Sequence, residues 1–311
     1  MVEFAVAVQS VRDLPVTTAP WTPFAHQNNV EAELQTLFFE EWSAQFGGLV
    51  KPGRLYFGSE FCQYRLAPLS AVKKALAFCR ENGLTFTFAT PFVHQDQFHR
   101  LAELLSFLND AGPCSGKRIE VVVNDWGVYH HIRTYFSNLD VVIGRLLNKM
   151  IRDPRVAHHY DNERAPESAR EFFKQPGLLS TWFTRFLEGG NVVGFDFDQL
   201  IQGTDVSDSV SPLIASLHFP YGCVASGSAC LVGFMDTPKS DKFRGDPNCK
   251  QQCQSYVFEL TNRRHTDMEH RVFQKGTTAF YAHKTATIKQ GLRSMQSLTS
   301  PRVVFSPRIP M

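Results

Sequence analysis

The stretch RIEVVVN, residues 118–124, is nearly all apolar and rich in β-branched side chains. A continuous apolar run of this kind is typical of a strand in a parallel sheet whose two faces are both covered by helices. The sequence predicts about eight such strands. The others lie at residues 54–58, 85–90, 140–144, 192–197, 213–217, 277–281 and 302–305.

Helix-like amphipathic segments separate these runs, at residues 30–46, 69–82, 95–109, 176–187 and 285–298. Alternating strands and helices predict an α/β protein, and about eight such units predict a TIM-like (β/α)8 barrel, with some irregularity allowed. A doubly wound open sheet is the main alternative, but no G-x-G-x-x-G follows the first strand. We expect a single barrel domain over residues 1–311.

The composition is that of an ordinary globular protein, with 43% hydrophobic and 20% charged residues. The 32 basic and 30 acidic residues give a net charge of only +2. Basic residues form short clusters such as Arg263 and Arg264, whereas a duplex-binding protein usually concentrates them on one face. The charge therefore does not indicate a nucleic-acid partner.

The N-terminal residues MVEFAVAV lack the charged region and long apolar stretch of a signal peptide. No apolar run approaches the roughly 20 residues of a membrane-spanning helix. We therefore expect a cytoplasmic protein without a membrane span. In that compartment the seven cysteines are expected to be thiols or metal ligands rather than disulfides.

Four of these cysteines fall within residues 223–253, in the pattern C-x6-C-x18-C-x3-C. Clustered thiolates suit an iron–sulfur centre or zinc. Structural zinc usually uses two tight cysteine pairs, and here only the second pair is tight, which favours iron and sulfide. Unliganded or redox thiols are a further alternative. The four residues are Cys223, Cys230, Cys249 and Cys253.

Cys62 is a fifth candidate, because it follows the predicted strand at residues 54–58. In a parallel barrel the functional rim lies at the C-terminal ends of the strands, so Cys62 is placed to reach that rim. A free loop thiol explains its local sequence equally well. We expect Cys79 to be a core residue and Cys114 to lie in a turn, and we assign neither a function.

Polar residues also follow several predicted strands and would meet at the same rim. Among them, Asp125, Arg145 and His218 could bind a carboxylate-bearing small molecule and transfer protons. Two of them have structural alternatives. Asp125 could cap a helix, and His218 could simply bind a backbone carbonyl.

The chain resembles the collagenase-like peptidases of the peptidase U family (U-thirty-two type). The resemblance runs from about residue 50 to the C-terminus and rests on the order of several motifs together with the cysteine cluster. These motifs are YFGSEFC at 56–62, VVNDWGV at 122–128, GRLLNK at 144–149, LHFPY at 217–221 and VVFSP at 303–307.

The resemblance implies a 4Fe–4S cluster, because several members of the family hold one. The layout is most similar to the V-type members of oxygen-independent ubiquinone biosynthesis, which have one cysteine after an early strand and three late ones. Two departures from the family are Ala229, where Arg is frequent, and a longer loop before Cys249. Carried over, the ligands would be Cys62, Cys230, Cys249 and Cys253, with Cys223 as the alternative to Cys62.

The function implied by the resemblance is oxygen-independent hydroxylation or biosynthesis, of the ubiquinone type, acting on a small-molecule substrate. It also implies a heterodimer with a paralogous family member. The alternatives are a peptidase with a structural metal site, zinc included, and a non-catalytic subunit paired with a paralogue. A conventional serine or zinc protease is poorly supported, since the chain has no nucleophile elbow and no H-E-x-x-H.

Overall fold

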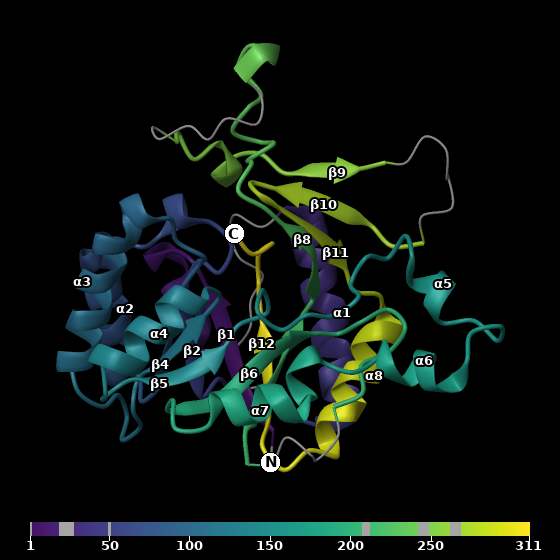
Figure 1. Ribbon diagram of the computed structural model, residues 1–311, viewed down its shortest axis with the longest axis horizontal. Coiled ribbons are helices and arrows are strands. Elements are labelled where there is room, and N and C mark those ends of the chain that lie inside the picture. The colour runs from purple at the N-terminus through teal and green to yellow at the C-terminus, as the bar shows by residue number, and fades with distance from the viewer. Residues whose placement is uncertain (1, 19–27, 49–50, 207–211, 242–248, 262–268) are drawn as a thin grey trace.

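Eight parallel strands close into a barrel in the order β1-β12-β7-β6-β5-β4-β3-β2 (Figure 1). The computed structural model describes residues 2–18, 28–48, 51–206, 212–241, 249–261 and 269–311. The predicted (β/α)8 barrel is confirmed. Its strands are β1 (Glu3–Val8), β2 (Arg54–Gly58), β3 (Thr85–Ala89), β4 (Glu120–Val123), β5 (Asp140–Ile143), β6 (Val192–Asp198), β7 (Ile214–Phe219) and β12 (Pro301–Phe305).

Helices follow most of the strands and cover the outside of the barrel. The barrel is irregular in two places: no helix lies between β6 and β7 in the described residues, and a small sheet is inserted between β7 and β12. The helices are α1 (Asn29–Phe46), α2 (Leu69–Glu81), α3 (Phe98–Asp110), α4 (Trp126–Tyr135), α5 (Ala157–Tyr160), α6 (Glu167–Phe172), α7 (Thr181–Leu187) and α8 (Thr285–Gln296).

The inserted sheet is antiparallel and has the order β8-β11-β10-β9. Figure 1 shows it above the end of the barrel opposite the N-terminus, with β9 outermost. That end carries the C-terminal ends of the barrel strands, where functional groups of such barrels gather. The strands are β8 (Tyr221–Ser226), β9 (Phe258–Leu260), β10 (Val272–Lys275) and β11 (Thr278–Ala282).

One predicted barrel strand was wrong. Residues 277–281 form most of β11, which pairs with β8 and β10 in the small sheet. The eighth barrel strand is instead β1, which lies between β2 and β12 in a segment for which we predicted no element. The mix of apolar and β-branched residues in 277–281 fits either kind of sheet, because a strand's composition does not identify its partners.

Alternation along the strands determines what fills the barrel. Val121 and Val123 of β4 pack outward in the core beneath the helices, whereas Val122 packs inside the barrel with Tyr56 and Val304. Period-two alternation is the direct result of strand geometry. The same alternation turns Asp196 of β6 inward, and likewise Asp198 and the β7 residue His218.

A buried ionic layer fills the N-terminal end of the barrel. Arg302 bonds Glu120 through both terminal nitrogens, at 2.8 and 2.9 Å, and its Nε lies 2.6 Å from Glu3. Arg54 completes the layer, 3.0 Å from Glu3 and 3.1 Å from Glu120. Because two arginines balance two glutamates, the layer is internally neutral, which buried charges require.

No helix in the described part of the chain combines the length and the apolar character needed to cross a membrane. The cysteine-rich segment at residues 223–253 begins within β8 and ends in a 3-10 turn, Gln252–Gln254, ahead of β9. Its described residues, 223–241 and 249–253, thus belong to β8 and to the connection from β8 to β9 of the inserted sheet.

Candidate functional site

Four of the five candidate cysteines line one pocket, which we call the thiol pocket. Cys62 comes from the loop after β2, whereas Cys230, Cys249 and Cys253 come from the segment between β8 and β9. Its remaining walls are formed by Tyr64, Arg65, Ser228, Gly233, Phe234, Gln252, Gly276 and Thr277. The fold therefore brings an early loop of the barrel against the late insertion.

Backbone N–H groups point at the sulfurs of this pocket. Gly233 donates to Cys230 Sγ at 3.1 Å, and Gln251 donates to Cys249 Sγ at 3.4 Å. The Tyr64 backbone likewise donates to the Cys62 thiol. Donors of this kind stabilise thiolates and tune sulfur-ligated clusters.

Burial raises the pKa of the Cys62 thiol to about 11, and it also raises the pKa values of Cys230 and Cys253. At neutral pH these groups are consequently protonated in the metal-free chain. A thiol gives up its proton when it ligates a metal, so metal uptake here would release protons. The positive charges of Arg65 and Lys275 oppose the effect of burial on Cys253.

The spacing of the sulfurs bears on which metal fits. Within the described residues, no three of these Sγ atoms lie within 4.8 Å of one another. A tetrahedral zinc with bonds of 2.3 Å would hold its thiolates roughly 3.8 Å apart. A cubane cluster places irons and sulfides between its ligands and so holds them farther apart. Four cysteine thiols are ligands that suit an iron–sulfur cluster or zinc, and the present positions of the sulfurs are not those of a closed zinc site.

Gln251 joins the two segments that form the thiol pocket. Its side-chain oxygen accepts a hydrogen bond from Arg65 at 2.9 Å, and its side-chain nitrogen donates to the Tyr64 carbonyl at 2.8 Å. Both partners lie just after Cys62, while Gln251 lies between Cys249 and Cys253. The position of the late cysteines relative to Cys62 therefore depends on this amide.

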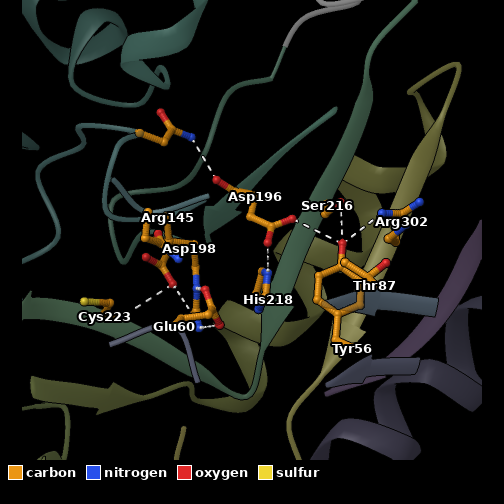
Figure 2. A network of polar contacts seen from close by, with 12 residues as sticks. Tyr56, Glu60, Thr87, Arg145, Asp196, Asp198, Ser216, His218, Cys223 and Arg302 are labelled. Carbon is orange, nitrogen blue, oxygen red and sulfur yellow. Dashed lines mark hydrogen bonds and ion pairs between the residues drawn. The ribbon is translucent and has the colours of Figure 1, made fainter. Parts of the chain in front are cut away.

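Cys223, the alternative to Cys62, lies outside the thiol pocket. It is fully buried on β8, opposite Phe280 of β11, and its N–H donates to Asp198 Oδ1 at 3.2 Å. Burial raises the pKa of its thiol to about 12. Figure 2 shows it beside the polar groups at the C-terminal end of the barrel.

These polar groups form a second arrangement, the barrel mouth, defined by Glu60, Arg145, Asp196, Asp198 and His218 (Figure 2). Arg145 has no exposed surface. Its Nε and one terminal nitrogen lie 3.1 and 2.7 Å from the two oxygens of Glu60, and its other terminal nitrogen lies 2.9 Å from Asp198. Two carboxylates therefore occupy Arg145 fully, which leaves it poorly placed to bind a substrate carboxylate.

His218 and Asp196 are the other half of the barrel mouth. Nε2 of His218 lies 3.1 Å from Oδ2 of Asp196, and the Tyr56 hydroxyl donates to Oδ1 of Asp196 at 3.3 Å. The Tyr56 ring stands edge-on to the imidazole, with centroids 6.0 Å apart. The predicted backbone bond from His218 is absent from the described residues, where neither ring nitrogen has a hydrogen-bond partner.

Asp125 caps a helix, which is the structural alternative that the sequence allowed. Its carboxylate accepts from the N–H groups of Gly127 and Val128 at the start of α4, at 2.6 and 3.2 Å, and from Val93. Asp and Asn are favoured at this position because they satisfy the free N–H groups of a helix start. The structure joins Arg145 and His218 to the barrel mouth but does not bring Asp125 into it.

Glu60 is the residue of the barrel mouth that sequence reasoning missed. It follows β2 directly, just as Arg145 follows β5, so its position after a strand was an available signal. Its role depends on Arg145, however, and the pairing of residues so far apart in the chain is visible only in the folded barrel.

Comparisons with known proteins add little to this description. No family model matches the chain, and no curated protein matches it. Among solved structures, the chain is similar to "The Structure of the U32 Peptidase Mk0906", with a TM-score of 0.41 and 11% sequence identity. That match covers 100% of this chain and 95% of the other. A similarity this low carries no argument about function, and the barrel rests on the strand pairing alone.

Proposed function

We propose that this chain binds a 4Fe–4S cluster through Cys62, Cys230, Cys249 and Cys253. The observation that carries the proposal is the convergence of these four thiols on one pocket from two distant segments of the chain. The backbone donors to Cys230 and Cys249 support the same choice, because such donors accompany sulfur-ligated clusters.

The proposed activity is oxygen-independent hydroxylation or a related biosynthetic reaction on a small molecule. A bound cluster with four thiolate ligands would supply electron transfer or structural support. The substrate would lie at the barrel mouth, where His218 and Asp196 are the buried groups that could transfer protons to or from it. Arg145 holds Glu60 and Asp198 in place around them.

The experiment is anaerobic purification followed by iron and sulfide analysis, absorbance and electron paramagnetic resonance. We expect about four irons and four sulfides per chain. Cys62→Ser should lose most of this iron. Cys223→Ser is the matched control, since it removes a buried cysteine outside the thiol pocket and should retain the cluster.

Three outcomes would count against the proposal. Colourless, iron-free protein after anaerobic reconstitution would show that the chain binds no iron–sulfur cluster. Loss of iron in Cys223→Ser together with full retention in Cys62→Ser would reverse the proposed ligand set. Zinc at one ion per chain in place of iron would identify a structural metal site instead.

A further inference from the structure

The barrel mouth contains one buried carboxylate that pairs with no arginine or lysine in the described part of the chain. Arg145 pairs with Glu60 and Asp198, and Arg152 lies 3.2 Å from the second oxygen of Asp198. Asp196 has no arginine partner among the described residues, and its side chain is completely buried. Three carboxylates thus face two guanidinium groups, so Asp196 depends on His218 or on a bound cation for its counter-charge.

Unpaired polar atoms mark the same spot. Oδ2 of Asp196 and both ring nitrogens of His218 lack a hydrogen-bond partner among the described residues, although His218 is only 1% exposed. Oδ2 and Nε2 are 3.1 Å apart but do not meet in hydrogen-bond geometry. Buried polar groups without partners are rare and costly in native proteins, so these three atoms are candidates for binding a ligand.

The unpaired atoms converge with Glu60. One ligand atom each from Glu60, Asp196 and His218 can be chosen so that all three lie within 4.8 Å of one another. Metal bonds of about 2.1 Å place neighbouring octahedral ligands about 3 Å apart, and the separation of Nε2 and Oδ2 matches this value. Each oxygen of Glu60 bonds Arg145 and still keeps a free lone pair.

We propose that Glu60, Asp196 and His218 bind a divalent first-row metal ion at the barrel mouth. One imidazole and two carboxylates suit Mn²⁺, Fe²⁺ or Zn²⁺ better than Mg²⁺ or Ca²⁺, which prefer oxygen alone. Three protein ligands leave positions open for water or for an oxygen of the substrate. The ion would also supply a counter-charge for the buried carboxylate of Asp196.

Neighbouring groups already hold these ligands in place. Tyr56 bonds the oxygen of Asp196 that does not face His218, and Arg145 bonds Glu60. Such supporting contacts orient the ligands of metal sites. The site is separate from the thiol pocket, so the inference does not depend on the proposed cluster.

The test is titration of the metal-free chain with Mn²⁺, followed by the loss of the free-ion resonance signal. Mn²⁺ is chosen because thiolates bind it poorly, which separates this site from the thiol pocket. We expect one Mn²⁺ per chain in the wild type. Asp196→Asn and His218→Gln should each weaken binding at least tenfold, whereas Cys249→Ser should bind like the wild type.

Circular dichroism and thermal melts establish that the variants are folded, and the wild-type titration tests the site even where a variant fails. The inference would be overturned if neither Mn²⁺, Fe²⁺ nor Zn²⁺ bound at the barrel mouth and if NMR showed His218 titrating as a cation beside Asp196. His218 and Asp196 would then form a simple ion pair. Unchanged Mn²⁺ affinity in both folded variants would also overturn it, since the ion would then bind elsewhere.

Discussion

Glu60 and Cys62 lie two residues apart on the loop after β2, and their side chains enter different sites. Glu60 Oε1 lies 2.7 Å from Arg145 in the barrel mouth, whereas Cys62 lines the thiol pocket. Phe61 lies between them, with its ring 5.0 Å from the Arg145 guanidinium and 5.0 Å from the Phe280 ring. A metal that moves Cys62 must therefore shift this packing or the ion pair beside it.

Glu60→Gln should destabilise the fold strongly. It removes one partner of a buried pair and leaves Asp198 as the only carboxylate of the described residues that pairs with Arg145, and breaking such a pair costs on the order of 3 kcal/mol. The free energy of unfolding in urea, measured with a chelator present, checks this value. The matched control is Glu259→Gln.

Glu259 also pairs with an arginine through two hydrogen bonds of 2.8 Å, but on the surface beside Arg271. Solvent screens that pair, so the control should change stability by less than about 1 kcal/mol. Equal effects of the two substitutions would mean that the Glu60 pair is as weakly coupled as an exposed one.

Asp125 should behave as a helix cap and not as a catalytic group. Asp125→Ala should cost about 1 kcal/mol of stability, whereas Asp125→Asn should lose little, because Asn also accepts from the helix N–H groups. Iron content and any activity per folded chain should stay at the wild-type level in both variants. A large loss of activity in folded Asp125→Asn would restore its catalytic role.

The strand composition was sufficient to predict the barrel, and seven of its eight strands follow from buried apolar runs such as residues 118–124. The pairing of strands could not be predicted in the same way. β1 and β11 are both short, apolar and β-branched or alanine-rich, yet one belongs to the barrel and the other to the inserted sheet. Long-range pairing, not local composition, separates them.

The candidate site also contains features that local sequence could predict and features that depend on long-range pairing. The position of Cys62 after a strand was enough to predict that it could approach the rim, because strand ends share one side of a barrel. The contacts made by Glu60 and Asp196 could not be predicted, since they depend on how β2, β6 and β7 are placed around the closed barrel. The sequence also allows Asp125 either to cap a helix or to face the rim, and only the start of α4 directly after it decides between the two.

The ionic layer at the other end of the barrel should make stability depend on acidity. Burial raises the pKa of Glu3, but the charges of Arg302 and Arg54 outweigh it and hold that pKa below its ordinary 4.5. A carboxyl with a lowered folded-state pKa contributes stability above the unfolded pKa and loses it as the pH falls through the folded value. Glu3 should therefore stabilise the fold at neutral pH and progressively less below about pH 4.5.

Urea unfolding of the wild type and Glu3→Gln at several pH values tests this dependence. The variant should be less stable at neutral pH, and the difference should narrow as the pH falls below 4.5. Glu269→Gln is the control, because Glu269 pairs with Lys284 on the exposed surface and should leave the profile unchanged. A constant difference between wild type and Glu3→Gln at all pH values would contradict the assignment.

Gln251→Ala should loosen the thiol pocket without unfolding the barrel. The substitution removes the bonds to Arg65 and to the Tyr64 carbonyl, which together tie the late cysteines to the Cys62 loop. Gln251 has a positive φ of 56°, and alanine keeps the β-carbon, so the backbone preference at this position hardly changes. The substitution also removes the bond that Gln254 donates to Gln251 Oε1, which lies within the late segment. The two bonds that join the segments correspond to about 1–3 kcal/mol, enough to make opening of the pocket at least several-fold more frequent.

Two measurements detect the opening of the thiol pocket. In cluster-loaded protein, the visible absorbance should decay several-fold faster under a chelator in Gln251→Ala than in the wild type. In the metal-free chain, the buried thiols of Cys62 and Cys253 should react faster with a thiol reagent, which tests the contact whether or not a cluster forms. Lys250→Ala, at an exposed neighbouring position, should match the wild type in both assays. Unchanged thiol reactivity in Gln251→Ala would mean that the two segments are held together without this side chain.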